Sequence, residues 1–154
     1  MIHGLLMSGA ILLLAGCGDP YEEGIQALEQ EKWEEAAIAF KRVPNLDKRH
    51  DDAEAKASEA YYQLGKLAHD RQDWPKVMEH VGMLGRKDTR YEEGRALMHV
   101  ARFHLGQAAY EKADWQQAIE LLSLVGKECE HREKARELLA EAQTKKAAAE
   151  ESAQ

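Results

Sequence analysis

The sequence repeats itself at a fixed step of 41 residues. The three tryptophans, Trp33, Trp74 and Trp115, follow this step. So do four further columns: Gly24, Gly65 and Gly106; Ala27, Ala68 and Ala109; Ala60, Ala101 and Ala142; and Tyr21, Tyr62 and Phe103. The frame has no insertion or deletion across three blocks, 21–61, 62–102 and 103–143. Such a period is typical of repeat proteins, in which each unit buries its apolar face by stacking on the next unit.

The composition favours helices throughout the repeats. Ala, Glu, Lys, Leu, Gln and Arg dominate, and only three prolines occur. These residues lose little rotamer freedom in a helix, so we expect an all-α fold with essentially no strand. At 154 residues the chain has room for one domain.

The pattern within each block resembles the tetratricopeptide repeat (TPR). In the second block Leu64, Gly65 and Ala68 precede Trp74 and Val77, which is the family's order of large, glycine, small, aromatic and small residues. The resemblance implies a right-handed solenoid of three TPR-like helical hairpins. The glycine column is expected to let the two helices of each hairpin approach closely, and its expected neighbours are Ala36, Val77 and Ala118. The tryptophans are expected to lie between each hairpin and the next.

The repeat is seven residues longer than the usual TPR of about 34 residues. Seven residues are two helical turns, so a helix can lengthen by seven and keep the same buried face. We place the extension at the start of the first helix of each unit. Helices are expected at 20–30, 33–43, 48–69, 74–84, 89–110, 115–125 and 130–149. The last one caps the stack, and 144–154 is expected to be a disordered or frayed helical tail.

Turn signals support these boundaries. Asp73 and Asp114 stand where N-caps are expected, and Pro75 falls in the first turn of its helix. Thr89 with Glu92 matches a capping box, and Asp47 is expected to cap the helix after it.

The N-terminal segment predicts export and a lipid anchor. Residues 1–16 contain no Asp, Glu, Lys or Arg, and their apolar run is shorter than the roughly 20 residues that span a bilayer. Its end, Leu14-Ala15-Gly16-Cys17, resembles the lipobox of bacterial lipoproteins. This resemblance implies that 1–16 is a signal peptide and that Cys17 carries diacylglycerol and acyl chains. By the sorting pattern of such lipoproteins, a glycine rather than an aspartate after the cysteine, here Gly18, implies the outer membrane, facing the periplasm, while Asp19 one place later leaves the inner membrane open. The alternative is a buried apolar N-terminal helix with a chance cysteine.

The charged side chains indicate neither nucleic-acid binding nor catalysis. The net charge is −7 with no cluster of Lys and Arg, which argues against nucleic acid and against adsorption to anionic lipid. The histidines lack metal-ligand spacing and are expected to be isolated on the surface. Paired acids on helices are typical of a solvated face. We therefore expect no catalytic residues, no metal and no cofactor. Cys129, the thiol left after lipidation, is expected to be buried or paired between molecules.

The resemblance to the TPR family also predicts a binding surface. The ligand-facing positions of that family fall here on Tyr21, Ile25, Leu28, Tyr62, Lys66, His69, Phe103, Gln107 and Tyr110. A stacked column of Tyr21, Tyr62 and Phe103 would suit an extended or helical segment of a partner. The alternative is that the longer helices bury these rings between them.

The predicted function is a lipid-anchored scaffold or assembly factor of the bacterial cell envelope, for example in outer-membrane assembly, secretion or pilus machinery. It would bind other envelope proteins through its concave face and the membrane through its anchor. The alternative is a non-catalytic lipoprotein adaptor that recruits a cell-wall enzyme.

Overall fold

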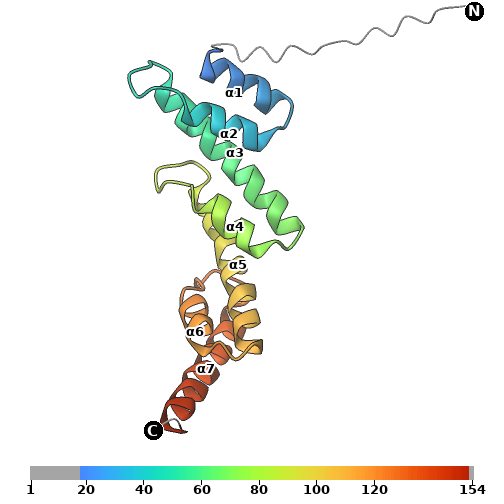
Figure 1. The fold of residues 1–154 in the computed structure, drawn as a ribbon, viewed down its shortest axis with the longest axis vertical. Coiled ribbons are helices and arrows are strands. Elements are labelled where there is room, and N and C mark those ends of the chain that lie inside the picture. Colours follow the sequence, from blue (N-terminus) through green and yellow to red (C-terminus); the bar gives the residue numbers. More distant parts are fainter. Residues whose placement is uncertain (1–17, 153–154) are drawn as a thin grey trace, which may run out of the picture.

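The computed structural model describes residues 18–152, and over this part of the chain the fold is all-helical. Seven helices follow one another in this part: α1 (Pro20–Glu29), α2 (Trp33–Lys41), α3 (His50–Asp70), α4 (Trp74–Val81), α5 (Tyr91–Glu111), α6 (Trp115–Ser123) and α7 (Arg132–Ser152). They form an elongated stack with α1 at one end and α7 at the other (Figure 1). The predicted signal segment 1–16, Cys17 and the last two residues lie outside the described residues.

The predicted alternation of short and long helices is confirmed from α2 onward, whereas α1 and α2 are both short. The helices α3, α5 and α7 each have 21 residues and begin at His50, Tyr91 and Arg132, which keeps the step of 41. Each helix packs against the next one along the chain, and the long helices also contact one another, α3 with α5 and α5 with α7. The long helices therefore join neighbouring hairpins. The segment expected to be a tail from 144 continues as helix α7 to Ser152.

The turn inside each hairpin has the same backbone conformation. Glu31, Gln72 and Ala113 occupy one column of the repeat and have φ values of 55°, 56° and 58°. This left-handed region reverses the chain within three residues, although it disfavours side chains with a Cβ. The predicted caps Asp73 and Asp114 follow directly. Their carboxylates accept hydrogen bonds from the backbone N–H of the third residue of α4 and of α6, Lys76 and Gln117, at 3.3 and 3.1 Å.

Two other predicted caps are wrong. The long helices begin at His50 and Tyr91, and neither has a side-chain cap. Asp47 instead accepts the Arg49 N–H at 2.8 Å within the preceding loop. Thr89 does not cap α5; Asp88 accepts the Gly85 N–H at 2.6 Å and holds the loop before it. Because these aspartates fold the loops back on themselves, each helix starts two residues later than expected.

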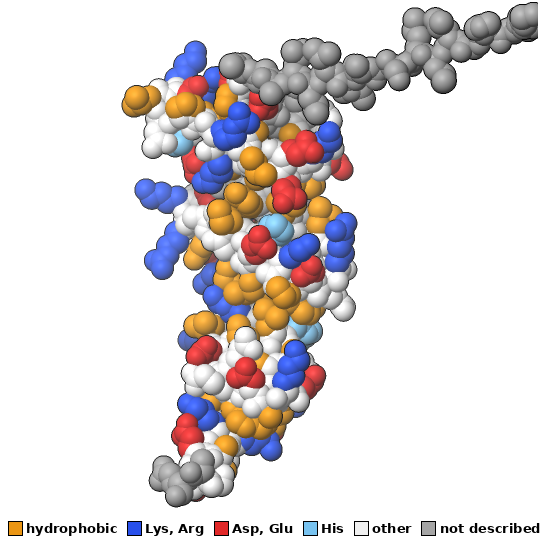
Figure 2. Space-filling view, viewed as in Figure 1, with side chains coloured by type: hydrophobic (Ala, Val, Ile, Leu, Met, Phe, Trp, Pro, Cys, Tyr) orange, Lys and Arg blue, Asp and Glu red, His pale blue; other side chains and the backbone are white. Residues whose placement is uncertain are grey.

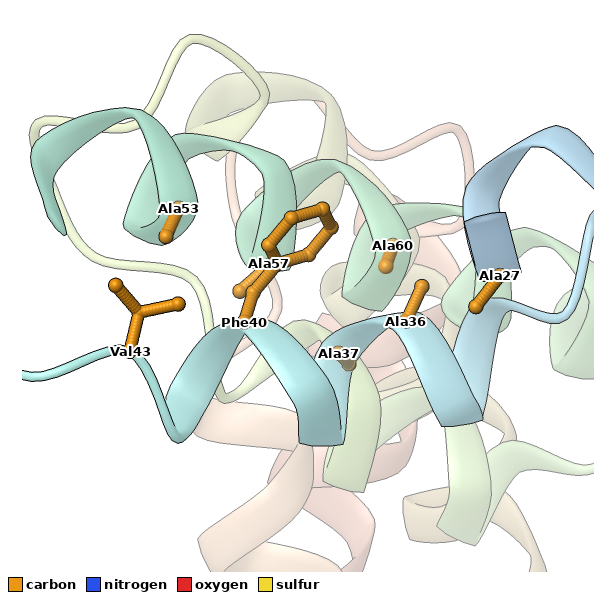
Figure 3. Packing of buried hydrophobic residues seen from close by; sticks show 8 residues of the cluster. All are labelled: Ala27, Ala36, Ala37, Phe40, Val43, Ala53, Ala57 and Ala60. Atoms are coloured by element: carbon orange, nitrogen blue, oxygen red, sulfur yellow. The ribbon is translucent and has the colours of Figure 1, made fainter. Parts of the chain in front are cut away.

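The core consists of three apolar clusters, one at each hairpin. In the first, the Phe40 ring is fully buried and points from α2 toward α3, beside Ala57 (Figure 3). The second column of alanines, Ala60, Ala101 and Ala142 on α3, α5 and α7, is fully buried.

The glycine column does bring the paired helices together, but its expected neighbours are wrong. A Cβ on Gly24 would lie 2.5 Å from the Phe40 ring, one on Gly65 would lie 2.6 Å from Val81 and one on Gly106 would lie 2.7 Å from Leu122. The glycines thus face the large residues one turn beyond Ala36, Val77 and Ala118. The missing Cβ makes room for one large side chain in each hairpin.

Within residues 18–152, no helix is both long enough and apolar enough to cross a membrane.

Candidate functional site: rings at the hairpin junctions

One aromatic ring lies at each junction between a hairpin and the long helix that follows it, α3, α5 or α7. We call Tyr21, Tyr62 and Phe103 the junction rings. The guanidinium carbon of Arg49 lies 4.7 Å from the centre of the Tyr21 ring, and that of Arg90 lies 5.3 Å from the centre of the Tyr62 ring. At the third junction Phe103 stacks on His131, with centroids 4.4 Å apart and planes 16° apart.

The residues that cover the junction rings form a column of their own. Arg49, Arg90 and His131 are 41 residues apart, and each stands at or just before the start of a long helix. A cation over an aromatic face contributes about 0.5–1 kcal/mol at exposed sites. Each ring therefore helps to dock one unit on the start of the next.

Carboxylates fix both arginines in place. Arg49 lies 2.8 Å from Asp47 and 2.8 Å from Asp19, and these hydrogen bonds lower the pKa of Asp47 to about 2 and also lower that of Asp19. Arg90 lies 2.8 Å from Glu59. Burial opposes ionisation of Glu59, yet hydrogen bonds from Arg90 and Gln63 keep its pKa below the ordinary value. Ion pairs with these carboxylates therefore hold both arginines over the rings.

Around Trp74 the rings form a larger group, which we call the aromatic cluster: His69, Trp74, His104, Phe103 and His131. Trp74 stacks on His104 with centroids 4.3 Å apart and planes 9° apart, and His69 meets its edge at 5.6 Å. His104 lies 5.2 Å from both Phe103 and His131. Burial and the two neighbouring imidazoles lower the pKa of His104.

The aromatic cluster corrects the expectation that the histidines are isolated on the surface and supports the expected position of Trp74. Three of the histidines are not isolated on the surface but pack together with two aromatic rings. Trp74 does lie between its own hairpin and the next, since His69 is on α3 and His104 is on α5. It is only half-buried, however, as are Trp33 and Trp115. No group of side chains suited to a metal ion is present in residues 18–152.

The predicted contact residues divide into three groups. Phe103 is a correction: it is only 6% exposed and belongs to the core. Tyr21, Ile25 and Leu28 are half-buried against the first apolar cluster. Of the remaining residues, Lys66 is exposed, and Tyr62, His69, Gln107 and Tyr110 are half-buried.

The predicted column of stacked rings does not form in the described structure. The junction rings contact Arg49, Arg90 and His131 instead of one another. The hydroxyl of Tyr21 donates to Asp52 of α3, which raises the pKa of that tyrosine.

Tyr110 is held from both sides. Its hydroxyl donates to Glu141 of α7, which raises its pKa, and its ring meets the edge of Trp115 at 5.3 Å. The surface available for contact is therefore a discontinuous set of half-exposed rings with Lys66 and Gln107 between them.

Sequence reasoning missed the partners of the rings, although one signal was present. The column of Arg49, Arg90 and His131 keeps the step of 41 and follows each junction ring by 28 residues. A cation or imidazole recurring at a fixed distance from an aromatic ring is the pattern that would have indicated the pairing.

A separate cleft lies between α5 and the loop after α6, lined by Ala96, His99, Glu128 and Cys129 among others. His99 accepts the Gly126 N–H at 3.0 Å, and burial lowers its pKa. Ser58, one repeat earlier, bonds instead to Asp88, which holds the Gly85 N–H. Cys129 stands in the column of Asp47 and Asp88, is half-buried and forms no disulfide within the described residues. The cleft therefore surrounds the contact through which His99 holds the loop after α6.

No family model, curated protein or solved structure matches this chain.

Proposed function

We propose that this chain is a lipid-anchored protein-binding scaffold or assembly factor of the bacterial cell envelope, built as a right-handed TPR-like solenoid and held at the outer membrane by lipid on Cys17. Its mature part would face the periplasm and bind other envelope proteins. The lipobox Leu14-Ala15-Gly16-Cys17 supports the anchor. Since each buried methylene of a lipid chain adds about 0.8 kcal/mol, two or more chains suffice for stable attachment.

The single observation that carries the binding role is a set of half-exposed aromatic rings on α3, α4 and α5. Tyr62, Trp74 and Tyr110 expose part of their rings beside Lys66 and Gln107. Aromatic rings with fixed orientation give large contact area at small entropic cost, which is why they dominate protein interfaces. Stacking on His104 and hydrogen bonding to Glu141 fix the orientation of two of these rings.

A photo-crosslinking amino acid tests this surface in the full, anchored chain. We expect crosslinks to another envelope protein from positions 66 and 107, on α3 and α5. Position 79, an exposed glutamate on α4, is the matched control and should give none. Equal crosslinking at all three positions, or none at 66 and 107, would contradict the proposal.

The identity of the captured protein separates two candidate functions. A subunit of an outer-membrane assembly, secretion or pilus machine supports the scaffold. A peptidoglycan synthase or hydrolase supports the alternative, an adaptor that recruits a cell-wall enzyme without catalysis of its own.

A further inference from the structure

The three loops that lead into the long helices each expose a large apolar side chain: Leu46, Met83 and Leu124. Residues 42–49 join α2 to α3 and residues 82–90 join α4 to α5, and both loops project from the same side of the stack (Figure 1). Leu46 in the first loop is 100% exposed and Met83 in the second is 51% exposed. Leu46 is fully exposed and therefore contributes nothing to the core.

The same two loops concentrate positive charge in an acidic protein. Together they contain six Lys and Arg residues and two Asp, whereas the whole chain has a net charge of −7. Lys48, Arg86 and Lys87 are exposed and form no ion pair with any residue in the part of the chain that the structure describes. Lys and Arg side chains are prominent along this side of the stack (Figure 2).

The chemistry of the loop tip changes along the stack. Leu46, Lys87 and Glu128 occupy one column of the repeat, so the tip is apolar in the first loop, basic in the second and acidic in the third. The third loop, 124–131, also carries Glu130. These three positions are equivalent in the repeat. The backbone therefore does not require the change from apolar to basic to acidic.

The first loop is tied to the segment that carries the proposed lipid. Arg42, at one end of the loop, lies 2.8 Å from Glu23, and Arg49, at the other end, lies 2.8 Å from Asp19. Cys17 precedes Asp19 by two residues, which span at most about 7 Å. A lipid on Cys17 therefore brings this loop to the membrane surface.

We propose that the loops 42–49 and 82–90 form a membrane-contacting edge. Leu46 enters the interface of the anionic bilayer that holds Cys17, and Lys48, Arg86 and Lys87 lie at its phosphate groups. Basic side chains near an anionic surface are attracted within about 10 Å, and the ion pair of Arg49 with Asp19 keeps the first loop close to the anchored segment. The acidic third loop lies farther along the stack from α1 than the other two loops (Figure 1). This inference rests on the proposed lipid anchor, and it gives the stack a defined orientation on the membrane.

Photolabelling from within the bilayer tests the inference. The full chain, produced with its lipid, is reconstituted in vesicles of phosphatidylethanolamine and phosphatidylglycerol (3:1) that contain a trace of lipid with an acyl-chain diazirine. After illumination and trypsin digestion, we expect at least tenfold more label in the peptide 43–48 than in 67–71. The second peptide is the matched control, since Leu67 is 40% exposed on α3.

Variants and lipid composition sharpen the result. Leu46→Asp should remove most of the label from 43–48, and Leu67→Asp should leave it unchanged. Replacing phosphatidylglycerol with phosphatidylcholine should reduce label in the second loop about threefold, because its contact depends on charge. Intact mass shows separately whether Cys17 is acylated. An unacylated protein overturns both the anchor and this inference, whereas an acylated protein with no label in 43–48, or with label insensitive to Leu46→Asp, overturns this inference alone.

Discussion

The effect of Gly65→Ala on the free energy of unfolding should change sign with the size of the residue at position 81. In a helix interior, Gly→Ala normally stabilises by about 1 kcal/mol. Here the new Cβ would lie 2.6 Å from Cγ1 of Val81, a residue that is 2% exposed, while the next nearest atom is 3.9 Å away. Valine is stiff at χ1, and overpacking of this kind costs about 1–3 kcal/mol. Gly65→Ala alone should therefore destabilise the protein by about 1 kcal/mol.

The same substitution should be favourable once Val81 is trimmed. Val81→Ala alone should cost about 2 kcal/mol through lost burial and the cavity that it leaves. In that background the clash is gone, so Gly65→Ala should recover about 1 kcal/mol, a coupling of about 2 kcal/mol between the sites. Urea denaturation of the four proteins of this double-mutant cycle measures the coupling. If Gly65→Ala costs the same in both backgrounds, the close approach of α3 and α4 is not what fixes this glycine.

Three further outcomes follow from the structure. Gln72→Gly should stabilise by about 0.5–1 kcal/mol, because the φ of 56° disfavours a side chain, and Gln72→Val should destabilise; thermal unfolding measures both, and a lower melting temperature for the glycine variant would contradict the left-handed turn. The pKa of Asp47 falls from 3.8 to about 2, so its contribution to the free energy of unfolding is present above about pH 4 and lost as the pH falls through about 2. Asp47→Asn should flatten the dependence of stability on pH in that window, and an unchanged slope would refute the Arg49 pairing. Cys17→Ser should abolish fatty-acid labelling, and a variant that still incorporates label would refute lipidation at this cysteine.

The sequence was most informative where one repeated position determines the local structure. The step of 41 residues and the cap residues Asp73 and Asp114 predicted the helices and the hairpin turns, because apolar period and capping act over a few residues. The starts of α3 and α5 were misplaced, since Asp47 and Thr89 look like caps in the sequence but neither caps its helix. Asp47 and Asp88 instead accept hydrogen bonds within their own loops.

The candidate site depended on contacts that no local pattern contains. Arg90 covers Tyr62 from 28 residues away. His104 meets Trp74 and His131 only because α4, α5 and the loop before α7 pack together. Phe103 shares a column with Tyr21 and Tyr62, yet its stacking on His131 accompanies burial in the core. Which member of a repeated column is exposed is decided by the residues of the neighbouring unit, and the period alone does not reveal it.

The central claim is that the surface around Lys66 and Gln107 binds another envelope protein, and a comparison of capture by matched variants tests it most directly. Anchored protein is recovered from detergent-solubilised envelope, and the partner identified by crosslinking is quantified. The double variant Lys66→Glu and Gln107→Lys should lose at least tenfold in capture with a melting temperature within about 2 °C of the parent, because neither side chain belongs to the core. Glu79→Lys, on α4, should capture as the parent does. Capture at full strength by the double variant would contradict the account.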